Sequence, residues 1–193
     1  IKIYKDIKIP KIIIVYDLTH EKFPEYYGLK KNHKIKQEAL NLSDYFLCPS
    51  KSAKNDLMEI YNIPSNKISV IYWAPFLEKS ESFQKIEGKP FLLYVGNRHK
   101  YKNAYTFLKA FSTNKYLKEN FKIIFFGGGH FKKFEKNIIS DLDLNNLVES
   151  YQGTDNDLIN LYRNARALVY PSKYEGLGLP ILEAMKNNCP VIT

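Results

Sequence analysis

Short apolar runs of strand length alternate with amphipathic stretches along the first part of the chain. The apolar runs lie at residues 12–16, 45–48 and 68–72, and helix-like stretches occupy about residues 30–42 and 50–61. Runs rich in β-branched and aromatic residues predict strands, and continuous apolar runs indicate strands that are buried on both faces. The second helix-like stretch opens on a serine that suits an N-cap. The first part is therefore expected to contribute parallel strands with covering helices.

The second part of the chain repeats this alternation and ends several of its strands in glycine. Strand-like and helix-like segments follow one another at residues 91–95, 104–111, 122–126, 132–140, 157–165 and 167–170. Such alternation favours a parallel sheet of the α/β class, in which ligands bind at the carboxyl ends of the strands. Gly96, Gly127 to Gly129 and Glu175 all follow strand ends, which predicts one shared site.

The last predicted strand leads into a glycine turn that lies between two acidic residues. Glu175 and Glu183 are 183 − 175 = 8 residues apart, with Gly176 and Gly178 between them and Pro180 placed to open a helix. Amide groups at a helix start attract anions, and glycine lets a ligand come close to the backbone. Carboxylates would repel a phosphate, so they are expected to accept hydrogen bonds from hydroxyls. The pattern predicts a nucleotide-sugar site, or else a structural turn whose glutamates face solvent.

From Pro171 to Met185 the sequence resembles the signature of the family 4 retaining glycosyltransferases. That signature reads P-S-x-x-E-G-x-G-x-P-x-x-E-A-M, and every fixed position is met; a motif of this length is far more specific than a short glycine pattern. The resemblance implies that Glu175 holds the transferred sugar and that Glu183 binds the ribose diol. It also implies a donor-binding turn that presents its amide groups to the diphosphate, formed by Gly176, Leu177, Gly178 and Leu179.

The same resemblance implies a B-type fold, which consists of two Rossmann-like α/β lobes with parallel sheets. Residues 1–76 are expected to form the end of the N-terminal, acceptor-binding lobe, residues 77–89 the linker, and residues 90–193 the C-terminal, nucleotide-sugar-binding lobe. Members of the family are longer than this chain, which begins with isoleucine rather than methionine. Both lobes are therefore expected to be incomplete, and the second is expected to be truncated at its end.

A basic loop follows the strand that ends at Gly96. It resembles the family's strand–glycine–loop segment, in which a lysine contacts the leaving diphosphate and an arginine stands directly after the glycine. Lys102 falls at the place of that lysine, whereas Asn97 stands in the place of the arginine and Arg98 follows one position later. The resemblance implies a catalytic role for Lys102, with Arg98 reaching the same phosphate. The alternative is a solvated loop of surface cations.

Two further segments resemble parts of the donor cleft. Gly127 and Gly128 follow a strand, where the family has a glycine-rich turn of the donor pocket; a glycine run alone is more typical of a tight turn. In the first lobe, Asp17 matches part of a histidine–aspartate pair whose histidine faces the transferred sugar, but Tyr16 stands in the histidine's place. Tyr16 and Asp17 are expected to line the cleft, and His20 is an alternative source of the imidazole. The replacement leaves sugar preference and full activity open.

Composition narrows the choice of partners and compartment. The net charge is +9, from 29 basic and 20 acidic residues, which suits a diphosphate substrate, an anionic membrane surface or nucleic acid. Neither an arginine-rich arm nor zinc-finger spacing accompanies the charge, so nucleic acid is not the expected partner. Cys48 and Cys189 are too few for a disulfide framework, and apolar stretches stay well below the roughly 18 residues of a membrane span. We expect a cytoplasmic protein, with peripheral association at the inner face of a membrane as a further partner.

A metal ion is not expected in the site. Asp141 and Asp143 form the Asp-x-Asp pattern that A-type glycosyltransferases use, but two alternating aspartates are common by chance, and a divalent ion needs further oxygen ligands. The cysteines and histidines do not have the spacing of a zinc site. A nucleotide-diphosphate sugar is thus expected as substrate, without a cofactor.

These features together predict an enzyme that moves a sugar from a nucleotide-diphosphate donor to a glycan or lipid-linked acceptor, with retention of configuration. In a site without metal, cations and amide groups stabilise the charge that grows on the departing diphosphate. By family analogy, the acceptor belongs to polysaccharide or lipopolysaccharide biosynthesis. The alternative is a catalytically incomplete, nucleotide-sugar-binding remnant or partner subunit. A third hypothesis, a nucleic-acid-binding Rossmann domain, would show itself by salt-dependent binding of oligonucleotides.

Overall fold

The chain divides into two compact units, each built on a parallel sheet. The computed structural model describes residues 8–27, 32–75, 77, 83–98 and 100–193. The first unit takes Ile1–Ala74 together with the short segment Tyr174–Gly178, and the second takes Pro75–Lys173 and Leu179–Thr193. The lobe and linker boundaries expected for the whole protein stay predictions.

The first unit is a three-stranded parallel sheet in the order β1-β2-β3. The strands are β1 (Ile12–Ile14), β2 (Tyr45–Cys48) and β3 (Ile68–Val70). The helical segments are α2 (Thr19–Lys22), α3 (Pro24–Tyr27), α4 (Asn32–Asn41), α5 (Lys51–Tyr61) and the 3-10 turn η1 (Ser65–Lys67). Helix α5 packs on the sheet because Ala53 and Leu57, both fully buried, share a core with Phe46. The predicted cap is confirmed, since Ser50 accepts a hydrogen bond from the amide of Ala53 at 3.1 Å.

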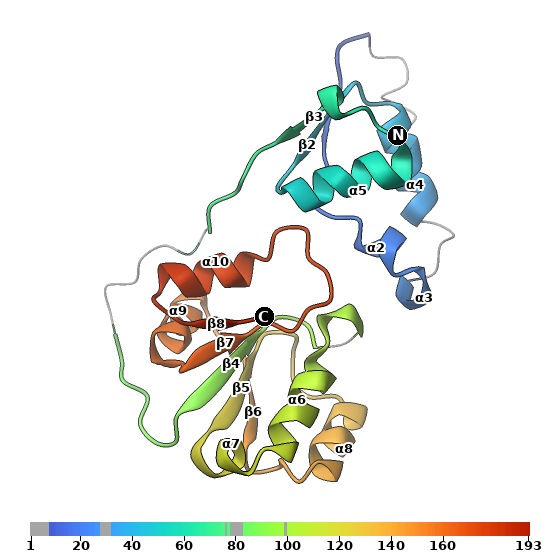
Figure 1. The fold of residues 1–193 in the computed structure, drawn as a ribbon. Helices are drawn as coiled ribbons and strands as arrows, with labels where there is room; N and C mark the ends of the chain where they lie inside the picture. Colours follow the sequence, from blue (N-terminus) through green and yellow to red (C-terminus); the bar gives the residue numbers. More distant parts are fainter. Residues whose placement is uncertain (1–7, 28–31, 76, 78–82, 99) are drawn as a thin grey trace. The chain divides into compact units, whose positions relative to one another are not determined.

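The second unit is a five-stranded parallel sheet in the order β6-β5-β4-β7-β8, with helices on both faces (Figure 1). The strands are β4 (Phe91–Val95), β5 (Lys122–Phe126), β6 (Val148–Tyr151), β7 (Ala167–Val169) and β8 (Val191–Ile192). The helical segments are the 3-10 turn η2 (Lys100–Lys102), α6 (Ala104–Thr113), α7 (Lys115–Asn120), α8 (Lys133–Asp141), α9 (Asp155–Asn164) and α10 (Leu179–Lys186). The predicted α/β class with parallel sheets is confirmed.

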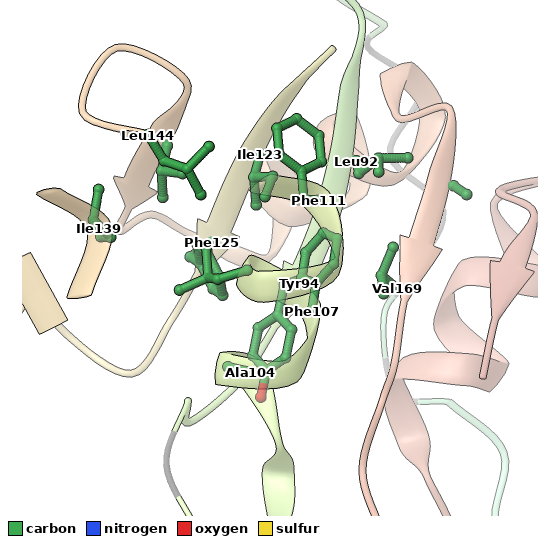
Figure 2. Close-up of a cluster of buried hydrophobic side chains, with 13 residues drawn as sticks. Leu92, Tyr94, Ala104, Phe107, Phe111, Ile123, Phe125, Ile139, Leu144 and Val169 are labelled. Atoms are coloured by element: carbon green, nitrogen blue, oxygen red, sulfur yellow. The ribbon is translucent and has the colours of Figure 1, made fainter. Parts of the chain in front are cut away.

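Two separate apolar cores cover the faces of this sheet. Successive residues of a strand point to opposite faces, so Leu92 and Tyr94 face the core beneath α6 and α8, while Phe91 and Leu93 face the core beneath α9 and α10. Figure 2 shows the first of these cores, in which Phe111 of α6 lies over the strands. Because both faces are buried, the central strands read as continuous apolar runs, which is why their sequence identified them.

Two elements of the second unit escaped sequence analysis. Strand β6 lies at the edge of the sheet, and of its four residues only Val148 is buried, while Glu149 and Tyr151 are exposed. Helix α7 is short and is capped by Asn114, whose side chain accepts a hydrogen bond from the amide of Leu117 at 3.1 Å. An edge strand with one covered face lacks the continuous apolar run that predicts a buried strand, but the asparagine cap was a readable signal for the helix.

The order of the strands brings the loops after β4, β5 and β7 to one edge of the sheet. The carboxyl ends of neighbouring parallel strands lie together, and open α/β sheets bind their ligands there. Strand β4 pairs with β5 on one side and with β7 on the other. Within the described residues, the longest apolar helix is too short to cross a lipid bilayer.

Candidate functional site

Gly96 and the glycine turn after β5 lie side by side at the carboxyl edge of the second unit's sheet. The amide of Gly96 donates to the carbonyl oxygen of Phe126 at 2.9 Å. A Cβ built on Gly128 would lie only 2.9 Å from the carbonyl oxygen of Gly96. Gly127, Gly128 and Gly129 have φ angles of +78°, +68° and +76°, a region in which side chains are strained. The structure thus brings the expected donor-pocket glycines together and explains their residue type.

Arg98 extends from the same loop into the protein. Its side chain is only 6% exposed, and its Nε donates to Oε1 of Glu135, on α8, at 2.8 Å. The guanidinium carbon lies 4.9 Å from the ring centroid of Phe131, which is within the range of a cation–π contact. The guanidinium expected at the leaving phosphate is therefore paired with a carboxylate that the sequence did not single out.

Glu135 links this arginine to the start of α8. Its Oε2 accepts a hydrogen bond from the amide of Lys132 at 2.8 Å, which satisfies one of the amide groups that a helix leaves unpaired at its first turn. Burial alone would raise the pKa of the Glu135 carboxyl, but the hydrogen bonds from Arg98 and Lys132, together with their positive charges, bring that pKa below its ordinary value. The carboxyl is therefore ionised at neutral pH.

Lys102 ends the turn η2, and its ammonium group lies against aromatic rings. Nζ is 5.2 Å from the ring centroid of Tyr101 and 5.8 Å from that of Tyr170, the residue that follows β7. On β4, the hydroxyl of Tyr94 donates to the carbonyl oxygen of Asn97 at 2.6 Å. This hydrogen bond holds the start of the basic loop to the sheet. Ring faces attract a cation, so the two rings help to fix the position of the Lys102 ammonium group.

Two hydrogen bonds join the basic loop to the first residues of the signature. Nδ2 of Asn103 donates to the carbonyl oxygen of Pro171 at 3.1 Å. The amide of Lys173 donates to the carbonyl oxygen of Tyr101 at 2.9 Å. All four residues belong to the second unit. The Lys102 segment and the beginning of the signature are therefore neighbours, although they lie far apart in the sequence.

Glu183 lies on α10, and a buried tyrosine orients its carboxylate. The hydroxyl of Tyr162, on α9, donates to Oε2 of Glu183 at 3.0 Å, and the Tyr162 side chain is fully buried. Burial raises the pKa of the Glu183 carboxyl; the Tyr162 hydrogen bond opposes this rise, and the charge of Asp155 adds to it. Sequence analysis missed Tyr162, because a tyrosine at helical spacing is indistinguishable from an ordinary core residue.

The segment Tyr174–Gly178 groups with the first unit, where it meets the two residues expected to line the cleft. A Cβ on Gly176 would overlap the carbonyl oxygen of Tyr16 and lie 2.9 Å from Cβ of Asp17, so only glycine fits at this place. Oδ1 of Asp17 accepts a hydrogen bond from the amide of Thr19 at 2.9 Å. Tyr16, Asp17 and His20 also line a hollow of about 460 Å³ in the first unit.

Tyr174, directly before Glu175, is anchored within the first unit. Its hydroxyl donates to Oδ2 of the buried Asp56 at 2.6 Å and accepts a hydrogen bond from the amide of Leu18 at 3.2 Å. Oδ1 of Asp56 is paired with Nζ of Lys22 at 2.6 Å. Burial raises the pKa of the Tyr174 hydroxyl, and the bond to Asp56 adds to the rise. Asp56 was not a sequence candidate, since a polar residue on a helix ordinarily faces solvent.

The part of the chain that the structure describes contains no cluster of three or more histidine, cysteine, aspartate or glutamate side chains arranged for a metal ion. Asp143 of the Asp-x-Asp pattern is instead paired with Nζ of Lys118 at 3.1 Å. Independence from metal stays a prediction.

Residues 76–193 match the family described as Glycosyl transferases group 1. This region contains both glycine loops, Lys102 and the two acids of the signature. The chain belongs to the glycosyl transferases group 1 family. The family resemblance carried by the signature is thereby confirmed.

Two curated relatives are described as O-antigen mannosyltransferases. The chain is 32% identical over 183 residues to the O-antigen chain mannosyltransferase RfbU of Salmonella typhimurium, covering 93% of this chain and 50% of the relative. It is 27% identical over 200 residues to the O-antigen chain mannosyltransferase B of Escherichia coli, covering 92% of this chain and 51% of the relative. The chain thus spans about half the length of these relatives.

Two solved structures share the fold. WaaG, described as a glycosyltransferase involved in lipopolysaccharide biosynthesis, matches with a TM-score of 0.73 at 19% identity, over 95% of this chain and 56% of that one. Sucrose-phosphate synthase from Thermosynechococcus elongatus matches with a TM-score of 0.75 at 17% identity, over 98% of this chain and 51% of that one. These matches confirm the expected Rossmann-like fold of B-type glycosyltransferases.

Proposed function

We propose that the protein carrying this chain transfers a sugar from a nucleotide-diphosphate donor to a glycan or lipid-linked acceptor, with retention of configuration. The observation that carries the proposal is the grouping at one sheet edge of the second unit: Gly96 beside the glycine turn, and the Lys102 loop beside the start of the signature. Parallel α/β sheets bind their ligands at this edge, and membership of the family adds the reaction class.

In the proposed reaction, the bond between the anomeric carbon and the donor phosphate breaks, and its electron pair goes to the phosphate oxygen. The acceptor hydroxyl attacks from the same face, forms the new bond to the anomeric carbon, and gives its proton to the departing diphosphate. Lys102 stabilises the negative charge that grows on this leaving group, since a fixed cation acts most strongly where charge develops. The turn that ends at Leu179 offers amide groups to the same diphosphate.

The two acids of the signature are proposed to bind hydroxyls. Glu183 accepts hydrogen bonds from the ribose diol, with its carboxylate oriented by the hydroxyl of Tyr162 at 3.0 Å. Glu175 accepts hydrogen bonds from the transferred sugar. Hydrogen bonds to an ionised carboxylate are stronger than neutral ones, which suits acids to gripping neutral diols beside a charged diphosphate.

The relatives guide the choice of substrates. Because two of them are described as O-antigen chain mannosyltransferases, mannose is the first sugar to test, and a lipid-linked glycan of polysaccharide or lipopolysaccharide biosynthesis is the first acceptor. Tyr16 bears on the sugar preference. Its side chain is 57% exposed and meets the ring of Trp73 edge to face, with centroids 4.8 Å apart, so an aromatic surface replaces the imidazole of other family members.

The test is a donor panel followed by analysis of the product. The protein is incubated with GDP-mannose, UDP-glucose and UDP-N-acetylglucosamine, with and without a lipid-linked glycan fraction, and released nucleoside diphosphate is measured. Acceptor-dependent release from one donor is expected, and the proton coupling at the new anomeric centre should match that of the donor. Binding without release would instead favour a catalytically incomplete, nucleotide-sugar-binding subunit, and inverted coupling would contradict retention.

A further inference from the structure

We propose that Arg98 is a positioning residue that, together with Glu135, holds the glycine turn after β5 in the shape that receives the donor. In this assignment the guanidinium acts through the turn and does not itself bind the diphosphate. The inference rests on the proposed function only for the identity of the ligand, because the structure that carries it lies wholly within the second unit.

The first support is the number of backbone carbonyl groups that the guanidinium contacts. Nη1 of Arg98 donates to the carbonyl oxygen of Gly127 at 2.8 Å. Nη2 reaches the carbonyl oxygens of the next three residues, Gly128 at 3.2 Å, Gly129 at 3.0 Å and His130 at 3.4 Å. One side chain thus gathers four consecutive carbonyl groups of a turn that would otherwise sample many conformations, since glycine is the least restricted residue.

This gathering sets the direction of the amide groups. In a trans peptide unit the C=O and N–H groups point in opposite directions. When the carbonyl groups of Gly127, Gly128 and Gly129 face the guanidinium, the amides of residues 128, 129 and 130 face away from it. Consecutive backbone amides that point outward form an anion-binding surface. Arg98 thereby orients backbone hydrogen-bond donors toward a phosphate or a ribose, and its own guanidinium is not one of these donors.

The second support is that the charge of Arg98 is already matched by a carboxylate. Glu135 accepts from Nε at 2.8 Å and from Nη2 at 3.4 Å, and its second role at the start of α8 fixes it in place. If the guanidinium moved away to bind a ligand, the largely buried carboxylate of Glu135 would lose its partner, and this costs free energy. The ring of Phe131 at 4.9 Å and that of Phe125 at 6.0 Å further confine the group.

The direction in which Glu135→Gln changes nucleotide affinity distinguishes a positioning role of Arg98 from direct binding. If Arg98 bound the diphosphate, Glu135→Gln would remove a competing carboxylate and strengthen nucleotide binding. If Arg98 holds the turn, Glu135→Gln weakens binding, because the guanidinium loses the partner that aims it. Glu149→Gln is the matched control: Glu149, on β6, pairs at 3.0 Å with Lys122, the first residue of β5, whereas the glycine turn follows the last residue of β5.

We would measure the binding of ADP, GDP and UDP, and of the matching monophosphates, by titration calorimetry. For the nucleotide that binds, Glu135→Gln and Arg98→Lys are each expected to lower affinity roughly tenfold, the scale of a lost charged hydrogen bond, and to lower it equally for mono- and diphosphate. The Glu149→Gln control should stay within about twofold. Unchanged or tighter binding by Glu135→Gln, or a loss confined to the diphosphate in Arg98→Lys, would overturn the assignment.

A second measurement tests the turn without any nucleotide. Hydrogen exchange at residues 127–131 should be faster in Glu135→Gln than in the parent or in Glu149→Gln, because the turn opens more often. Gly128→Ala should speed it more than Gly129→Ala: both residues have positive φ, but only the Cβ at residue 128 would approach Nη1 of Arg98, at 2.9 Å.

Equal exchange in these variants would overturn the assignment on its own. If the parent protein binds no nucleotide at all, the proposed function fails, and the exchange comparison still decides whether Arg98 holds the turn.

Discussion

Arg98 and Lys102 stand in the same basic loop, yet the structure gives their charges different surroundings. The guanidinium of Arg98 is 6% exposed and paired with Glu135, whereas the ammonium group of Lys102 lies near the ring faces of Tyr101 and Tyr170. The position of a basic residue after a strand therefore does not decide its role: Arg98 bonds to Glu135 and to the glycine turn of its own unit, while Lys102 is the cation that we propose for the leaving group.

The largest difference between the two cations is expected in turnover. Lys102→Ala should lower kcat about 100- to 1000-fold, the scale seen when one group that stabilises developing charge is removed, with a much smaller change in KM for the donor. Lys109→Ala, a lysine on the exposed side of α6, is the control and should keep full activity. The kinetic constants for the best donor check this prediction, and an unchanged kcat in Lys102→Ala would remove the proposed leaving-group role.

The next difference is expected in the free energy of unfolding, where the loss of Arg98 should have a larger effect than the loss of Lys102. Arg98→Ala should lower the free energy of unfolding by about 3 kcal/mol, because Glu135 is left as a largely buried, unpaired carboxylate. Lys102→Ala should lower it by less than about 1 kcal/mol. Urea unfolding followed by circular dichroism measures both. The double variant Arg98→Ala with Glu135→Ala should recover part of the loss, and a simple sum of the single losses would contradict the pairing.

A smaller effect is expected from the tyrosine that orients Glu183. Tyr162→Phe removes the hydroxyl that donates to Glu183 at 3.0 Å and should raise KM for the donor roughly fivefold to tenfold, as for one hydrogen bond to a charged group, while kcat changes little. Tyr116→Phe, at a tyrosine that is 65% exposed, is the control. If kcat fell instead of the donor affinity, Glu183 would have a role other than ribose binding.

The contact between Tyr162 and Glu183 also predicts that donor affinity depends on pH. Burial raises the pKa of Glu183 above its ordinary value, and the carboxylate form is the one that accepts hydrogen bonds from a diol. Donor affinity should therefore be complete above that raised pKa and decline as the pH falls through it. Tyr162→Phe removes the hydrogen bond that lowers this pKa, so the decline should begin at a higher pH. Profiles of kcat/KM against pH for both proteins test the direction of the shift.

How much of the fold could be predicted depended on how the elements are buried. Strands β4 and β5 were readable because both faces of the sheet are covered, which made their sequences continuous apolar runs. Strand β6 was not, since only Val148 among its residues is buried. The segment Tyr174–Gly178 groups with the first unit, where Tyr174 bonds to Asp56, and no sequence periodicity predicts a contact between residues 118 positions apart.

The candidate site shows the same limit. The glycines were predicted because the positions require positive φ or close approach, demands that only glycine meets without strain. The partners of the charged residues were not predicted: Glu135 lies 37 positions from Arg98, and Tyr162 lies 21 positions from Glu183. Local sequence patterns therefore identify the groups of a site, while the contacts that set their charge and direction arise from the tertiary fold.

The smallest expected effect concerns the hydroxyl beneath the basic loop. The ring of Tyr94 is 1% exposed, and its hydroxyl donates to the carbonyl oxygen of Asn97 at 2.6 Å. Tyr94→Phe keeps the ring in the core and removes a hydroxyl that also lies 3.3 Å from the carbonyl oxygen of Lys102, so the free energy of unfolding should fall by about 1 kcal/mol. Because Arg98 holds the glycine turn independently, donor KM should change less than in Tyr162→Phe. A larger loss of donor affinity would show that the loop between Gly96 and Lys102, rather than the glycine turn, sets the shape of the donor site.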